Sequence, residues 1–200
     1  MNSVITEYIP FKGLLIESTT KPGIFEVEGV VQRAGDKNHN GRVYELEVLS
    51  REVDKYVKNF VEIGNAYGEL DHPDSPVVNL KNASHVVKAL WWNGNDLLGR
   101  LELLNTPSGN IVKEILKGGH TIGISSRGTG TVKETNEGYL KVQDDFELVC
   151  WDFVSNPSTK GAFMKPVKLN EGIEPVNRYA RAHDLVGELL CLTANKCLLR

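Results

Sequence analysis

The chain has 200 residues, of which 40% are hydrophobic, and this is enough for one sizeable core with a tail. Its formal net charge of −3 and its dispersed basic residues argue against direct nucleic-acid binding, and no apolar run reaches the length of a membrane span. The three cysteines lack metal-type spacing and fit a reducing cytosol, and the first residues show no secretory signal.

Strands are predicted at residues 9–16 and 24–34, because both segments carry short apolar runs or alternating apolar side chains. Residues 35–41 are rich in turn formers and indicate a loop. In residues 47–63 apolar side chains recur every three or four positions, which predicts an amphipathic helix.

The middle of the chain predicts a hairpin and a second helix. Residues 86–92 and 97–104 indicate two strands, joined by the turn at residues 93–96. A helix is predicted at residues 107–118, because Thr106 offers a capping hydroxyl, proline follows at the first helical position and two glycines end the apolar pattern.

Three further strands, at residues 130–133, 138–142 and 146–154, follow a strand that begins after the second helix. These elements predict an α+β fold with a mostly antiparallel β-barrel or sandwich that carries the two helices. Strand signals then fade. We therefore expect one compact domain at residues 1–166 and a linker with a helical tail at residues 167–200.

Three polar residues in apolar or glycine-rich segments are the candidates for chemistry: His72, Ser125 and Asp152. A serine hydroxyl becomes a good nucleophile when an imidazole accepts its proton, and a carboxylate can orient that imidazole. Because antiparallel sheets bring distant segments side by side, the spacing of these residues permits a serine-hydrolase triad. It does not establish one.

Structural alternatives exist for each candidate. Adjacent side chains of a strand face opposite ways, so only one of Ser125 and Ser126 can meet the histidine. A histidine before proline is often a turn residue, and Arg127 either orders a loop or is solvated. Strand alternation predicts that Asp152 shares a face with Leu148 and Cys150, where it is either the partner of a histidine or an edge carboxylate.

The other titratable residues form no motif for a metal or a cofactor, and no glycine-rich phosphate loop follows a strand. We therefore expect neither a metal nor a cofactor. The weaker candidates are His39, His85, His120, His183, Asp36, Asp71 and Asp74.

Five segments resemble, in the same order, the prohead core proteases of T-even-like tailed bacteriophages, which share a fold with herpesvirus assemblin. The match spans about residues 24–160. The segments are Asn38-His39-Asn40-Gly41-Arg42-Val43-Tyr44, Gly68-Glu69-Leu70-Asp71-His72-Pro73, Trp91-Trp92-Asn93-Gly94-Asn95-Asp96, Gly123-Ile124-Ser125-Ser126-Arg127-Gly128 and Asp152-Phe153-Val154-Ser155-Asn156-Pro157-Ser158.

The resemblance implies an assemblin-type fold, in which His72 is the base and Ser125 the nucleophile. The third member of the triad varies within the relatives, between a second histidine in herpesvirus proteins and a carboxylate in other phage proteins. Asp152 is our choice by position and charge.

The resemblance also implies a serine endopeptidase inside the immature capsid in the host cytoplasm. Its expected substrates are scaffold or core proteins, the major capsid protein, internal proteins and the protease itself, with no direct nucleic-acid or membrane partner. Cleavage is expected after glutamate with an apolar residue two positions earlier. Of the segments Leu15-Ile16-Glu17, Ile24-Phe25-Glu26 and Leu169-Asn170-Glu171, we hypothesise that the last, in the linker, is a self-processing site.

Two other classes of function stay open. A non-enzymatic scaffold or capsid-assembly protein could retain these polar residues for structure on the same fold. An esterase or amidase for small molecules is disfavoured, because the strand–turn–helix nucleophile elbow is absent. The sequence leaves the oligomeric state open, with a homo-oligomer among the alternatives.

Overall fold

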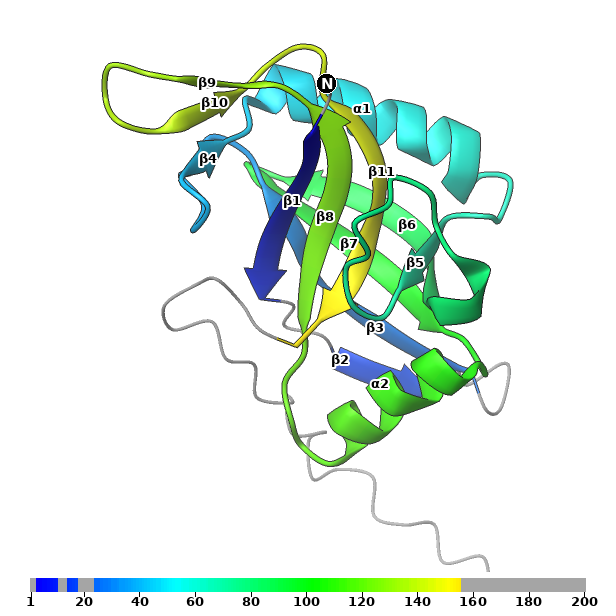
Figure 1. Ribbon diagram of the computed structural model, residues 1–200. Helices are drawn as coiled ribbons and strands as arrows, with labels where there is room; N and C mark the ends of the chain where they lie inside the picture. The colour runs from blue at the N-terminus through cyan, green and yellow to red at the C-terminus, as the bar shows by residue number, and fades with distance from the viewer. Residues whose placement is uncertain (1–2, 11–13, 18–23, 156–200) are drawn as a thin grey trace, which may run out of the picture. The chain divides into compact units, whose positions relative to one another are not determined.

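The computed structural model describes residues 3–10, 14–17 and 24–155, a mixed α/β structure of mostly strands with two α-helices (Figure 1). The strands are β1 (Ser3–Pro10), β2 (Leu14–Glu17), β3 (Phe25–Arg33), β4 (Arg42–Val43), β5 (Tyr67–Glu69), β6 (Ala83–Asn93), β7 (Asp96–Leu103), β8 (Gly123–Gly130), β9 (Val132–Glu134), β10 (Leu140–Val142) and β11 (Glu147–Val154). The helices are α1 (Leu46–Tyr56), the π-helix η1 (Val57–Val61), the 3₁₀-helix η2 (Leu80–Asn82) and α2 (Pro107–Lys117).

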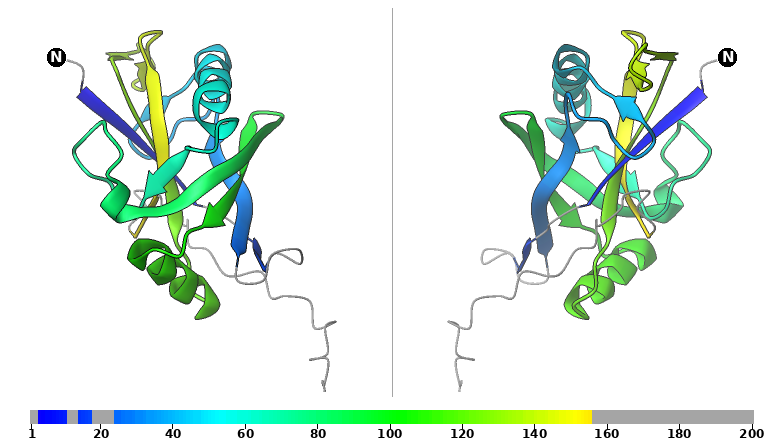
Figure 2. Two further views of the ribbon diagram at one scale, coloured as in Figure 1. Left: turned by 90° about the vertical axis from the view of Figure 1, so that its right-hand side faces the viewer. Right: turned by 90° about the vertical axis from the view of Figure 1, so that its left-hand side faces the viewer.

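The strands of the described residues form three sheets. Their strand orders are β1-β8-β11, β2-β3-β7-β6-β5 and β4-β10-β9. The core joins the two larger sheets, because its buried side chains come from β3, β6 and β7 on one side and from β8 and β11 on the other. Figure 1 shows α1 at one end of these sheets and α2 at the opposite end, and Figure 2 shows the arrangement from the side.

The two larger sheets meet where β5 ends. Leu70 pairs in parallel with Phe153 of β11, and the backbone N–H of Asp71 donates to the carbonyl of Phe153 at 2.7 Å. Gly68 permits this approach, since a Cβ at this position would clash with the carbonyl oxygen of Trp151. In the described part of the chain the sheets otherwise stay distinct, so the assemblin-type barrel stays a prediction.

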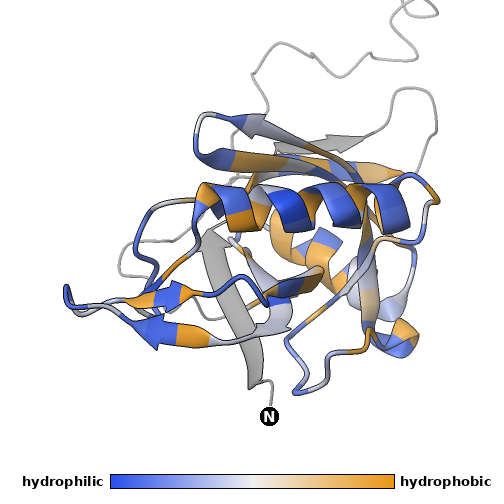
Figure 3. Ribbon diagram, turned by 90° about the horizontal axis from the view of Figure 1, so that it is seen from above, coloured by the Kyte–Doolittle hydropathy of each residue, from blue (hydrophilic) through white to orange (hydrophobic). Residues whose placement is uncertain are grey.

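The helix predicted at residues 47–63 is found, as α1 followed by the π-helical turn η1. Figure 3 shows alternating apolar and polar residues along α1. The buried apolar residues of α1 are Val48, Leu49, Val53 and Tyr56, whereas Leu46 at its start is exposed. Burial of this stripe against the sheets, more than intrinsic helix propensity, stabilises the helix.

The helix predicted at residues 107–118 is α2, and its start has the expected cap. The hydroxyl of Thr106 accepts a hydrogen bond from the N–H of Gly109 at 3.1 Å and donates to the carbonyl of Ala83 at 2.5 Å. The second bond fixes the start of α2 to β6. Pro107 stands at the first helical position and Gly118 at the end.

Most predicted strands are found, with one correction. The segment 9–16 is not one strand, because β1 ends at Pro10 and pairs with β8, whereas β2 begins at Leu14 and pairs with β3. Proline lacks an N–H and suits the end of a strand better than its middle. The predicted linker and tail at residues 167–200 lie outside the described residues. No helix within the described ranges is long and apolar enough to cross a membrane.

Candidate active site

A β-bulge in β11 sets the direction in which Asp152 points. Leu148 pairs with Gly128 of β8, the next pair is made by Cys150, and Val149 is the extra residue between them. Leu148 therefore joins the core, whereas Cys150 and Asp152 point to the opposite face. The prediction that all three share a face was wrong, because the extra residue shifts the alternation of the strand.

The register of β8 against β11 separates the two serines. Ser125 lies opposite Asp152, and Ser126 lies opposite Trp151. Directly opposite residues of an antiparallel pair share a face. Ser125 therefore shares the face of Asp152. The hydroxyl of Ser126 is turned to the core and has no hydrogen-bond partner among the described residues. Both serines are buried, and Ser125 is 2% exposed.

His72 lies in the loop that follows β5, directly after the bridge to β11. Its Nδ1 is 2.7 Å from Oδ2 of Asp152, and its side chain is 21% exposed. An N–H donated from Nδ1 to a carboxylate leaves the lone pair on Nε2, which is the tautomer of a general base. Nε2 is buried and has no partner among the described residues, so no hydrogen bond joins it to Ser125 in this structure.

Asp152 is fully buried and is held as an anion by several donors. Its Oδ2 accepts from Nε of Arg127 at 2.9 Å as well as from His72, and its Oδ1 accepts from the backbone N–H of Glu69 at 2.9 Å. Burial alone would raise the pKa of Asp152, but the bond from His72, the charge of Arg127 and the Glu69 N–H together lower it below its usual value. Asp152 is therefore ionised at neutral pH.

Two buried charges, Arg127 and Glu69, belong to the same cluster and were not among the predicted site residues. Nη2 of Arg127 donates to Oε1 of Glu69 at 2.8 Å, and Nη1 donates to the carbonyl of Ser75 at 2.5 Å. Both side chains have no exposed surface. The alternation of β8 could have placed Arg127 on the face of Ser125, but nothing in the sequence indicates that Glu69 faces it.

His85 is also buried but lies outside this hydrogen-bonded cluster. Its Nδ1 is 2.9 Å from the hydroxyl of Ser84, and its ring contacts that of Phe153 edge-on. Burial lowers the pKa of His85 to about 4, so the ring is neutral at pH 7. The described residues contain no group of three or more His, Cys, Asp or Glu that could hold a metal ion.

The burial of His85 predicts acid sensitivity of the fold. Between pH 6.5 and pH 4 an unfolded histidine binds a proton that the folded one does not, so the free energy of unfolding falls as the pH falls. We expect a loss of about 2 kcal/mol from pH 7.5 to pH 5, measured by urea unfolding. His85→Gln should lose much less over this interval, since the lowered pKa values of Asp152 and Glu52 act only at lower pH. Equal losses in both proteins would contradict this origin.

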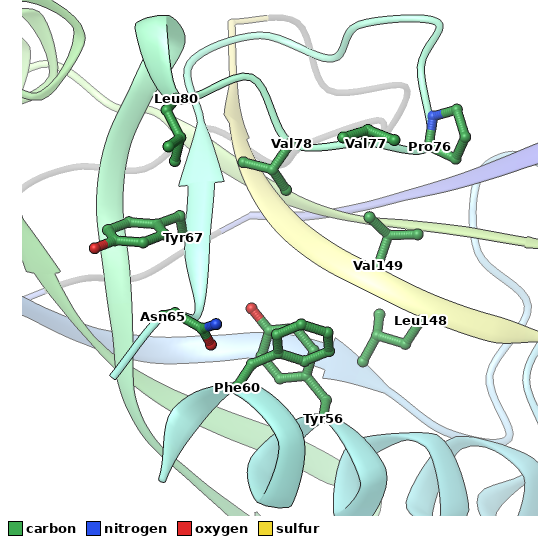
Figure 4. Close-up of a pocket in the computed structure, with 10 residues that line it drawn as sticks. All are labelled: Tyr56, Phe60, Asn65, Tyr67, Pro76, Val77, Val78, Leu80, Leu148 and Val149. Atoms are coloured by element: carbon green, nitrogen blue, oxygen red, sulfur yellow. The ribbon is translucent and has the colours of Figure 1, made fainter. Parts of the chain in front are cut away.

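An apolar pocket of about 380 Å³ adjoins the loop that carries His72 (Figure 4). The loop forms one wall through Pro76, Val77 and Val78, and Leu80 of η2 continues it. The other walls come from η1, β5, β11 and the end of α1. Val77 and Leu80 are strongly exposed for apolar residues. Such a pocket can take an apolar side chain of a bound peptide.

The chain is similar to known proteins over a range that includes every residue of the candidate site. The family model described as "Prohead core protein serine protease" matches residues 13–174. The prohead core protein protease of Enterobacteria phage T4 is 34% identical over 154 residues, which are 76% of this chain and 72% of that protein. The structure of the bacteriophage T4 capsid assembly protease is similar with a TM-score of 0.73 and 30% identity, over 78% of this chain and 99% of that one.

Proposed function

Because the chain belongs to the prohead core protein serine protease family, we propose that it is a serine endopeptidase of capsid maturation with an assemblin-type fold. Its substrates are scaffold, capsid and internal proteins, and it acts inside the prohead in the host cytoplasm. The observation that carries the proposal is the short contact between His72 and the buried carboxylate of Asp152, on the face to which Ser125 belongs. This pairing of residue types prepares a serine for nucleophilic attack.

Each residue has a distinct role in the proposed reaction. Oγ of Ser125 attacks the scissile carbonyl carbon while Nε2 of His72 accepts its proton, and the same nitrogen then protonates the leaving amine. Water hydrolyses the acyl-enzyme by the reverse route. Asp152 holds the Nδ1–H and stabilises the imidazolium. Binding of substrate has to bring Nε2 and the hydroxyl together, as catalytic hydrogen bonds are often long in substrate-free structures.

We further propose cleavage after glutamate, with an apolar residue two positions before it. The pocket beside the His72 loop supports an apolar requirement, because its loop wall begins four residues after His72. The segment Leu169-Asn170-Glu171 has the proposed pattern and lies outside the described residues, and we propose it as the self-processing site.

The test is cleavage of a peptide that contains Leu-Asn-Glu, beside a matched peptide with Asp-Asn-Glu. The wild-type chain is expected to cut the first peptide after glutamate and the second far more slowly, because the pocket cannot solvate a carboxylate. Mass spectrometry identifies the cleavage products of both peptides and the C-terminal residue of the protein itself. A new C-terminus at Glu171 is expected. Cleavage of the peptide at another position would refute the proposed specificity. An unchanged C-terminus at Arg200 after prolonged incubation of active protein would refute the self-processing.

A second candidate is a non-enzymatic capsid-assembly protein on the same fold. It is favoured by the burial of Ser125 and by Nε2 of His72, which has no hydrogen-bond partner among the residues that the structure describes. Absence of cleavage of any prohead protein by the wild-type chain, together with binding to those proteins, would support this candidate instead.

A further inference from the structure

The guanidinium of Arg127 is buried where a positive charge is costly, so its partners indicate its role. Three of them are the carboxylates of Asp152 and Glu69 and the carbonyl of Ser75. Burial lowers the pKa of Arg127, but its acidic neighbours outweigh this and raise it above the usual value. Arg127 is therefore always positively charged, and it contacts the carboxylate that binds His72.

The charges of this cluster balance in one protonation state only. Asp152 and Glu69 contribute two negative charges and Arg127 one positive charge, all without exposed surface. With a neutral imidazole the cluster has a net charge of −1, and with the imidazolium of His72 the net charge is zero. Without Glu69, Arg127 would cancel Asp152 and leave no net charge to stabilise the imidazolium.

The same two residues hold the loop on which His72 lies. Oε1 of Glu69 accepts the backbone N–H of Asn79 at 2.9 Å, and Oε2 accepts from Nδ2 of Asn82 at 3.3 Å. Arg127 binds the carbonyl of Ser75, between His72 and Asn79. The loop is thus fixed by a buried ion pair at its middle and at its far end.

We infer that Glu69 and Arg127 are positioning residues of the active site. Together they fix the His72 loop, and Glu69 neutralises the charge of Arg127, so that the negative charge of Asp152 stabilises the imidazolium of His72. The inference rests on the proposed function, since it assigns the ion pair a part in general-base catalysis. Neither residue touches the reacting atoms.

The other groups that face the cluster do not alter this charge count. Burial raises the pKa of the Cys150 thiol on β11 and of Tyr56 on α1 well above their usual values, so both are neutral. His85 on β6 is neutral as well. Asp71 and Asp74, on the loop itself, are exposed to solvent and therefore act on His72 only weakly.

The test uses the acid limb of the pH profile of kcat/KM, which moves with the net charge around the base. Glu69→Gln should move this limb about one pH unit down and Arg127→Met about one unit up. The double variant Glu69→Gln/Arg127→Met restores the net charge of −1 and should return the limb close to that of the wild type. Each variant should also lower kcat, by up to about 10²-fold, because the loop loosens.

Arg127→Lys and Glu114→Gln are the matched controls. Arg127→Lys keeps the positive charge but loses the planar guanidinium, which donates to several partners at once. The kcat should therefore fall while the acid limb stays in place. Glu114→Gln removes an exposed carboxylate on α2 and should change neither quantity. NMR titration of the His72 ring measures the same shift without relying on activity. An inactive wild type therefore refutes the proposed function, while the titration still tests whether the ion pair sets the charge around His72.

The inference is supported if the two single variants shift the acid limb, or the midpoint of the NMR titration, in opposite directions. Reduced kcat with an unmoved titration in Glu69→Gln refutes it and leaves the pair a merely structural role. Glu69→Gln keeps the shape of the side chain, so it decides alone if Arg127→Met does not fold.

Discussion

Replacing Ser125 by alanine is expected to lower kcat for peptide cleavage by at least about 10⁴-fold, because Ser125 carries the hydroxyl directly opposite Asp152 in the pairing of β8 with β11. Ser126→Ala is expected to keep kcat within about tenfold of the wild type. Its hydroxyl faces the core beside Trp151 and has no hydrogen-bond partner in the described part of the chain, so its removal should leave stability unchanged or slightly raise it.

A fluorophosphonate that labels activated serines measures the same difference directly. Mass spectrometry should locate the label on Ser125 in the wild type and in Ser126→Ala, and find no label in Ser125→Ala. Urea unfolding of all three proteins separates loss of the nucleophile from loss of the fold. Loss of both label and cleavage in Ser126→Ala alone would reverse the assignment of the nucleophile.

Asp152→Asn should lower kcat by about 10⁴-fold, the size seen when a triad aspartate becomes an amide. An amide N–H₂ facing Nδ1 of His72 would require a lone pair on that nitrogen. The proton would then lie on Nε2, where it prevents that atom from accepting the proton of Ser125. The prediction is measured as single-turnover cleavage at several pH values, in parallel with unfolding.

Asp152→Asn should also destabilise the fold, by about 1–3 kcal/mol. Both carboxylate oxygens accept from at least two donors, so either orientation of the amide points an N–H at another donor. Asp74→Asn is the matched control, since Asp74 is an exposed carboxylate on the His72 loop. A fully stable Asp152→Asn with unchanged kcat would exclude Asp152 from the site.

The sequence predicted those features that depend on local patterns. The apolar stripe of α1, the capping hydroxyl of Thr106 and the turn predicted at residues 93–96 are all found at or near the expected positions. The residues His72 and Asp152 were singled out by residue type, and the structure places them in contact. Their catalytic roles stay predictions.

The features that were missed depend on pairing between distant strands. Period-two alternation cannot show the bulge at Val149, because an extra residue leaves no mark in the pattern of apolar side chains. The ion pair of Glu69 and Arg127 joins β5 to β8, and only the folded arrangement brings these strands to one cluster. Buried charges of this kind look like surface residues until their partners are known.

Because Leu70 and Phe153 are bridged, the main chain sets the distance between His72 and Asp152. His72 and Asp152 are near neighbours of these two bridged residues, so backbone hydrogen bonds determine how far apart they lie. β5 has only three residues, and it is held on one side by β6 and at its end by the bridge to β11. Any shift of β5 against β11 would therefore change the distance between His72 and Asp152 even where both side chains stay intact, so the geometry of the pair depends on the junction of the two sheets.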